Sequence, residues 1–112
     1  MSKFGNLGNL GGMGGLMKQA QKMMEQAKQI EEELGNQVVE GTAGGGMVVA
    51  EMSGLGKVIS IKIDPQVVDP DDVEMLQDLV VSALHEASEK SEALRQERQK
   101  QLMGGMGIPG LF

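Results

Sequence analysis

The chain has no cysteine, tryptophan or tyrosine among its 112 residues, and its two phenylalanines, Phe4 and Phe112, stand near the termini. Without cysteine there is no disulfide framework, no thiolate metal ligand and no thiol nucleophile, so the fold depends on packing alone. Without internal aromatic rings there is no platform on which unpaired bases could stack. The composition therefore disfavours a disulfide-stabilised secreted domain and a binder of single strands.

A long hydrophobic run is also missing. Only Lys3 precedes a stretch of Gly, Asn and Leu at the N-terminus, whereas a signal peptide needs about 7 to 15 apolar residues and a membrane span about 20. We therefore expect a soluble, cytoplasmic protein with no membrane partner. The length suits a single domain with a modest core.

Charge is distributed unevenly along the chain. The net charge of −6 counts against DNA, because phosphate neutralisation by Lys and Arg usually supplies most of the affinity. Residues 31–92, however, hold 14 acidic and three basic side chains, whereas residues 1–30 carry a net +3 and residues 93–112 a net +2. Both ends of the chain are thus basic and its centre is acidic.

Residues 1–12 are rich in glycine, which is poorly suited to helix or strand, so we expect a flexible arm. A long amphipathic helix should follow, because apolar side chains then recur in alternating steps of three and four and define one heptad seam. This seam consists of Met13, Leu16, Ala20, Met23, Ala27, Ile30 and Leu34. Gly35-Asn36 suits the C-terminus of the helix.

Three short strands are expected next, at residues 37–42, 47–53 and 58–64. The glycines of residues 43–46 suit a hairpin turn with positive φ, and residues 54–56 suit a second turn. In the third strand, Ile59, Ile61 and Ile63 alternate with other residues, which predicts that all three lie on one buried face.

The second helix has a strongly marked start at residues 69–72. Asp69 is expected as the N-cap, Pro70 as the first helical residue, and the following acids lie at the positive end of the helix dipole. Apolar residues keep helical spacing from Val73 to Leu94, and no Gly or Pro interrupts before Gly104, where a flexible Gly/Met tail over residues 104–112 begins.

The expected fold class is therefore α+β, with the order helix-strand-strand-strand-helix and one domain over residues 13–103. A 30-residue helix spans about 45 Å, whereas a compact 100-residue domain has a radius of gyration near 13 Å, so the helix ends should project. A three-stranded meander with two helices leaves apolar surface uncovered, and the heptad seam needs a facing partner. Both features predict a homodimer.

The sequence gives little support for a catalytic site or a metal site. His85 and Glu89 are one helical turn apart, but a catalytic zinc site usually needs three protein ligands. The acids of residues 31–33 and 69–72 are explained by capping and solubility, and no Gly-Lys-Ser/Thr follows the glycines of residues 41–46 as in a phosphate-binding loop. We expect no enzyme, no cofactor, no metal and no small-molecule substrate.

Basic side chains on the two helices are the main indication of function in the sequence. Lys18 and Lys22 are one turn apart, as are Arg95 and Arg98, so each pair shares a helix face. Glutamines surround both pairs and can hydrogen-bond phosphates or base edges.

The motif Leu16-Met17-Lys18-Gln19-Ala20-Gln21-Lys22-Met23, together with Ile63-Asp64-Pro65 and Glu74-Met75-Leu76-Gln77-Asp78-Leu79-Val80, resembles the YbaB/EbfC family of bacterial nucleoid-associated proteins. The similarity covers nearly the whole chain in the same order of elements. It implies an intertwined homodimer with projecting helices, double-stranded DNA as partner, a nucleoid location and an influence on chromosome organisation or gene expression. The expected DNA contacts are Lys18, Lys22, Lys28, Arg95, Arg98 and Lys100.

The acidity of the chain predicts weak, salt-sensitive DNA binding. The alternative is a dimeric interaction scaffold or adaptor whose Met-rich arms contact proteins and which never meets DNA. A gel shift at two salt concentrations would separate these two functions.

Overall fold

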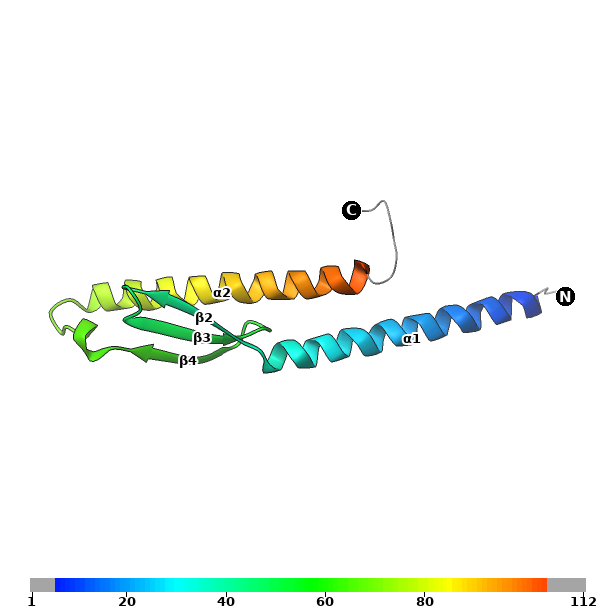
Figure 1. Ribbon diagram of the computed structural model, residues 1–112, viewed down its shortest axis with the longest axis horizontal. Coiled ribbons are helices and arrows are strands. Elements are labelled where there is room, and N and C mark those ends of the chain that lie inside the picture. Colours follow the sequence, from blue (N-terminus) through cyan, green and yellow to red (C-terminus); the bar gives the residue numbers. More distant parts are fainter. Residues whose placement is uncertain (1–5, 105–112) are drawn as a thin grey trace. The chain divides into compact units, whose positions relative to one another are not determined.

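The computed structural model describes residues 6–104 (Figure 1). Its elements are helix α1 (Asn6–Asn36), strands β2 (Val38–Ala43), β3 (Val48–Ser53) and β4 (Val58–Ile63), the short 3-10 helix η1 (Pro65–Val67) and helix α2 (Val73–Gly104). This α+β order of helix, three strands and helix is the predicted one. The chain divides into two compact units, residues 1–30 and residues 31–112.

The first unit contains α1 as far as Ile30. The helix begins at Asn6, earlier than the predicted Met13, so part of the segment expected as a flexible arm is helical. Once a helix is nucleated, each added residue gains a backbone hydrogen bond, and this offsets part of the cost of the glycines. Residues 1–5 and 105–112, which belong to the expected arm and tail, lie outside the described residues.

In the second unit the three strands form an antiparallel sheet of order β2-β3-β4. Gly44, Gly45 and Gly46 have positive φ in the β2–β3 turn, as the hairpin prediction requires, and Gly56 has positive φ in the β3–β4 turn. The strand bounds match the predicted ones to within a residue at each end.

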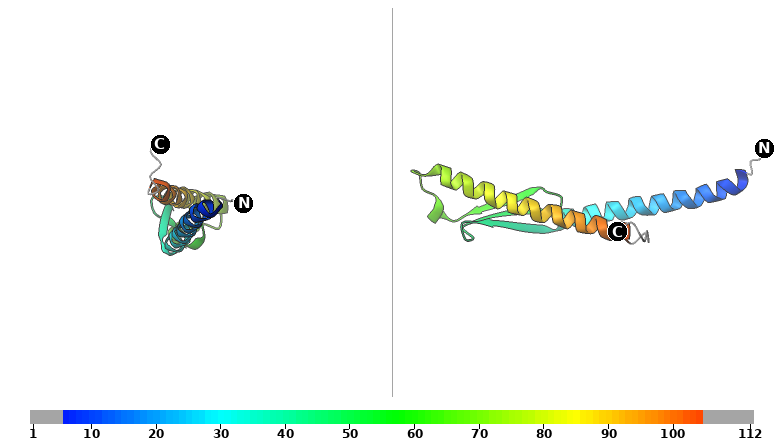
Figure 2. Two further views of the ribbon diagram at one scale, coloured as in Figure 1. Left: turned by 90° about the vertical axis from the view of Figure 1, so that its right-hand side faces the viewer. Right: turned by 90° about the horizontal axis from the view of Figure 1, so that it is seen from above.

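Helix α2 covers one face of the sheet, against β2 and β3 (Figures 1 and 2). The core consists of Val48, Ala50 and Met52 on β3 with Ala83 and Ala87 on α2. Gly41 makes the close approach possible, because a Cβ there would lie 2.1 Å from the carbonyl oxygen of Ala83. The C-terminal part of α2 extends past the ends of the strands (Figure 1), as the projecting-helix prediction requires.

The prediction of a buried isoleucine face is wrong for the single chain. Ile59 is 53% exposed, and Ile61 and Ile63 are each 39% exposed. The register places Ile61 opposite Ala50 and Ile63 opposite Val48, so both lie on the side of the sheet that α2 covers. They stay exposed because α2 packs over β2 and β3 and leaves β4 uncovered, whereas the irregularity between Glu51 and Met52 takes Ile59 out of the alternation.

The start of α2 also differs from the prediction. The helix begins at Val73, and its N-cap is Asp72, whose carboxylate accepts a hydrogen bond of 3.2 Å from the backbone N–H of Met75. Asp69 instead accepts from the N–H of Asp71 at 2.9 Å and closes the preceding turn. Asp69 and Asp72 each make a local side-chain hydrogen bond, and Asp72, the last acid before the apolar stripe, caps the helix.

Candidate nucleic-acid interface

Helix α1 exposes a basic face opposite its apolar seam. Lys18, Lys22 and Lys28 are all exposed. With 3.6 residues per turn, these three lie on the side of the helix opposite Leu16, Ala20 and the rest of the seam. The three lysines therefore share one surface of the first unit with glutamine side chains and one acid, Glu25.

Two shallow hollows mark this basic face. One has a volume of about 370 Å³ and is lined by Gly15, Lys18, Gln19, Gln21, Lys22 and Glu25. The other has a volume of about 410 Å³ and is lined by Gln21, Met24, Glu25 and Lys28. Within residues 6–104, none of the three lysines takes part in an ion pair. Their ammonium groups therefore remain available to phosphate.

The heptad seam on the other side of α1 is exposed as well. Leu16 is 65% and Met23 38% exposed, and the seam becomes buried only at Leu34, which is 5% exposed. The last turn of α1 is fastened to the β3–β4 turn, where the carbonyl of Leu34 accepts a hydrogen bond of 2.9 Å from the N–H of Gly54. From Leu16 to Leu34 the predicted seam is present, and most of it is exposed among the described residues.

Arg95 is engaged inside the fold. Its Nη1 donates to the carbonyl of Gly54 at 3.0 Å and to Oγ of Ser91 at 2.8 Å. Ser91 is fully buried and donates in turn to the carbonyl of Ser53 at 2.9 Å. The guanidinium thus ties α2 to the turn between β3 and β4.

Arg98 is held in a similar way. Its Nη2 donates to the Glu33 carboxylate in an ion pair, and its Nε is buried without a hydrogen-bond partner among the described residues. Lys100, by contrast, is exposed. Of the six expected DNA contacts, four lysines are open to solvent and the two arginines make contacts within the protein. The sequence pattern did not indicate the contacts of Arg95 with Gly54 and of Arg98 with Glu33, because these partners are 41 and 65 positions away.

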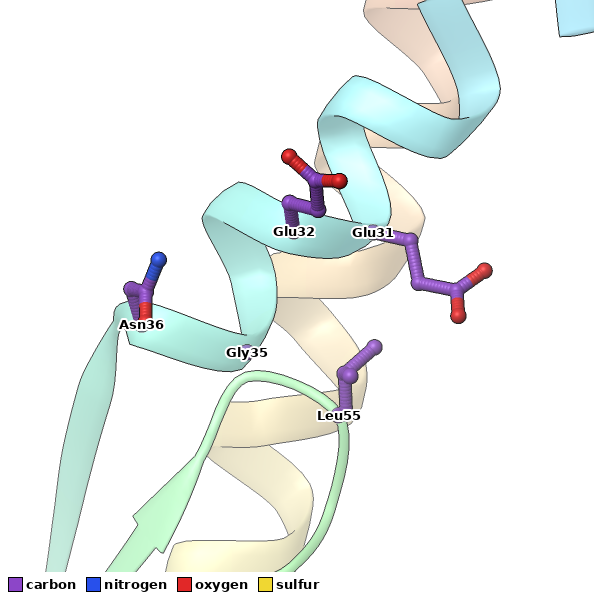
Figure 3. A pocket seen from close by; sticks show the side chains of 5 residues that line it. All are labelled: Glu31, Glu32, Gly35, Asn36 and Leu55. Carbon is purple, nitrogen blue, oxygen red and sulfur yellow. The ribbon is translucent and has the colours of Figure 1, made fainter. Parts of the chain in front are cut away.

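The acidic centre of the chain forms surfaces that repel phosphate. A hollow of about 450 Å³ at the end of α1 is lined by Glu31, Glu32, Gly35, Asn36 and Leu55 (Figure 3). The two carboxylates stand apart rather than facing each other (Figure 3), and the hollow has no histidine, serine or other nucleophile beside them. The two carboxylates, with no basic side chain in the lining, disfavour an anion in this hollow.

Two carboxylates on the second unit have lowered pKa values. The Ser60 hydroxyl hydrogen-bonds to the Glu51 carboxylate and lowers its pKa, and Lys62 adds to the effect. The backbone N–H of Thr42 does the same for Glu86, with help from Lys90. Both groups stay ionised at neutral pH and keep this part of the protein negative.

No group of three or more potential metal ligands occurs within residues 6–104. His85 is exposed on α2, in keeping with the interpretation as part of a solvated helix face. No helix in the described part of the chain is long and apolar enough to cross a membrane.

The described residues thus form a small α+β protein of helix-meander-helix order with an exposed basic helix face. The sequence matches the YbaB/EbfC DNA-binding family over residues 9–106, and the chain belongs to that family. This family is defined by DNA binding and is not an enzyme family.

Two proteins with similar sequences are both described as nucleoid-associated proteins. A nucleoid-associated protein of Chloroflexus aurantiacus is 52% identical over 97 residues, which cover 87% of this chain and 95% of the relative. One of Desulforamulus reducens is 50% identical over 97 residues, covering 87% of this chain and 92% of the relative.

A crystal structure of an uncharacterised protein from Helicobacter pylori has the same fold. The TM-score is 0.64 at 27% sequence identity, with 85% of this chain and 94% of the other covered. The predicted fold class and family are thereby confirmed.

Proposed function

We propose that this protein is a nucleoid-associated homodimer that binds double-stranded DNA and influences nucleoid organisation or gene expression. The observation that carries the proposal is the exposed face of α1 with Lys18, Lys22 and Lys28, which faces away from the apolar seam and makes no ion pair with any described residue. Lysine ammonium groups bind phosphate as point charges, and the neighbouring amides add hydrogen bonds to the backbone. Lys100 supplies a further exposed charge on α2.

The four lysines, rather than the two arginines, are assigned the phosphate contacts. Arg95 and Arg98 already donate to Gly54, Ser91 and Glu33. Transfer of either guanidinium to a phosphate would break these bonds, whereas the exposed lysines bind without such a cost. Contacts of this kind fix position on the duplex and carry little sequence information. The binding is therefore expected to depend weakly on sequence.

A homodimer follows from the apolar surface that one chain leaves open. Among residues 14–103, for which side-chain burial is described, only six apolar side chains are buried, namely Leu34, Val48, Ala50, Met52, Ala83 and Ala87. Full burial of a Val or Ile is worth about 1.5–3 kcal/mol, so half-exposed residues such as Ile61 and Ile63 each retain roughly 1 kcal/mol for an interface. Two copies double that sum and double the number of lysines that meet DNA.

A gel shift with duplex DNA at ~50 mM and ~200 mM salt tests the proposal, combined with light scattering of the free protein. We expect binding at low salt that weakens sharply at high salt, because counterions are released when lysines neutralise phosphates. Light scattering should give twice the 11.9 kDa chain mass. A folded dimer that binds no duplex even at the lower salt would instead favour the interaction scaffold.

A further inference from the structure

Methionine is the one sulfur-containing residue that the chain offers to an oxidant. Mild oxidants modify the sulfur of cysteine and methionine side chains, and the chain has ten methionines but no cysteine. A hydroperoxide that meets this protein therefore reacts at thioether sulfur. The exposure of each methionine then decides which one reacts first.

Two methionines of α1 differ from the others in exposure. Met24 is 71% and Met17 63% exposed, more than any other methionine whose side chain is described. Met75 on α2 is 39% exposed, whereas Met52 belongs to the core and is 5% exposed. The two most accessible thioethers among the described residues thus lie on the helix that carries Lys18, Lys22 and Lys28.

Met17 and Met24 lie at the border between the apolar seam and the basic face. Their separation of seven positions is close to two turns, so both are on the same side of α1. Met24 lines one hollow of the basic face together with Gln21 and Lys28. Gln21 is one turn from Met17, and Lys28 is one turn from Met24, so each thioether has a hydrogen-bond donor as its helical neighbour.

We propose that Met17 and Met24 form an oxidation site through which hydroperoxides weaken DNA binding. The inference rests on the proposed function and adds a regulation of the same helix face. The thioether sulfur attacks one oxygen of the hydroperoxide, the O–O bond breaks, and the sulfur is oxidised by two electrons to a sulfoxide. The proton of the transferred oxygen passes to the departing oxygen, which leaves as water or as an alcohol.

The sulfoxide changes what α1 presents to a phosphate. A thioether is apolar and a weak acceptor, whereas a sulfoxide is polar and its oxygen carries partial negative charge. This oxygen accepts a hydrogen bond from the Gln21 amide or the Lys28 ammonium group and so occupies donors assigned to DNA. It also repels the phosphate oxygens. The net charge of the protein is unchanged, so the affinity should fall while the salt dependence changes little.

A pair of methionine-to-leucine variants tests the site. Met17→Leu/Met24→Leu removes both sulfur atoms and keeps apolar side chains of similar size that favour a helix. Met75→Leu is the control, because it removes an exposed methionine of α2 that does not adjoin the four lysines assigned to DNA. Duplex binding at ~50 mM salt, where lysine–phosphate contacts are strong, is measured before and after treatment with hydrogen peroxide. Peptide mass spectrometry shows which methionines have gained oxygen.

Oxidation should weaken duplex binding in the wild type and in Met75→Leu by on the order of 3- to 10-fold, the effect of one lost hydrogen bond. Met17→Leu/Met24→Leu should keep its affinity under the same treatment. The two methionine sulfoxide reductases, one for each epimer, should restore the wild type. Light scattering should give the same mass for the wild type before and after oxidation.

Several results would overturn the oxidation site alone. One is an unchanged affinity in wild type whose Met17 and Met24 are fully oxidised, and another is an equal loss in the leucine variant. Oxidation of Met52 before Met17 and Met24 would contradict the exposure argument, and dissociation of the oxidised protein into chains of 11.9 kDa would move the effect away from the DNA-binding face. A wild type that binds no duplex before oxidation would instead overturn the proposed function, and the regulation with it.

Discussion

Replacing Arg95 by methionine separates the structural role seen here from the DNA contact expected from the sequence. Methionine keeps an unbranched apolar chain but removes the guanidinium, and with it the hydrogen bonds to the Gly54 carbonyl at 3.0 Å and to Oγ of Ser91 at 2.8 Å. Hydrogen bonds to charged groups contribute about 1.5–3 kcal/mol each. Because Arg95 is partly exposed and Ser91 keeps its bond to Ser53, we expect the free energy of unfolding to fall by about 1–3 kcal/mol.

Thermal unfolding followed by circular dichroism measures this loss. Each kcal/mol lowers the Tm of a domain of 60–100 residues by roughly 4–8 °C. Wild type and variant must be compared at one protein concentration, because dimerisation makes the Tm concentration-dependent. Lys100→Met is the matched control, since it removes the same charge at an exposed position of the same helix.

The control should show the opposite pattern, with an unchanged Tm and weaker duplex binding. The reasoning would be refuted if Arg95→Met kept the wild-type Tm and flattened the salt dependence of duplex binding. Arg95 would then act as a phosphate contact, as its spacing from Arg98 indicated.

Two further predictions concern the second unit. Gly41→Ala should lower the free energy of unfolding, measured in urea, by at least about 3 kcal/mol, because the new Cβ would lie 2.1–2.3 Å from backbone atoms of α2. Gly45→Ala has open space around it but a φ of 68°, so it should lower the free energy of unfolding by only about 1 kcal/mol. Equal losses in the two variants would contradict the packing argument. The lowered pKa of Glu86 adds stability that is present above its unfolded pKa and is lost as the pH falls through the folded value, so the wild-type free energy of unfolding should decrease below about pH 4.5. Glu86→Gln should show a shallower decrease, and identical pH profiles would exclude the Thr42 contact as its cause.

Local patterns made most of the fold predictable. The heptad seam, the glycine turns and the alternation of β4 each lie within a short window, so the elements and their order follow from spacing alone. The same patterns did not locate the cap of α2, because Asp69 and Asp72 both satisfy a local motif. They also did not show that Ile61 and Ile63 stay exposed in one chain, since that depends on where α2 crosses the sheet.

The candidate site was predictable for the lysines and not for the arginines. Lys18 and Lys22 are exposed on a helix face that spacing alone defines. Arg95 and Arg98 show the same kind of spacing, but Gly54 in the β3–β4 turn and Glu33 near the end of α1 also bind them. Side chains that bridge elements far apart in the chain have no periodic signal, so only the folded structure separates a solvated arginine from one that fastens two elements.

The central claim, that α1 lysines carry the DNA contact, is tested most directly by the salt dependence of duplex binding in the variant Lys18→Gln/Lys22→Gln/Lys28→Gln. If about four to six phosphates are neutralised per dimer, log K of the wild type should fall with log salt at a slope near −4 to −5. The triple variant should remain folded, bind all duplex sequences more weakly and show at most about half that slope. An unchanged affinity and slope in the folded variant would contradict the account.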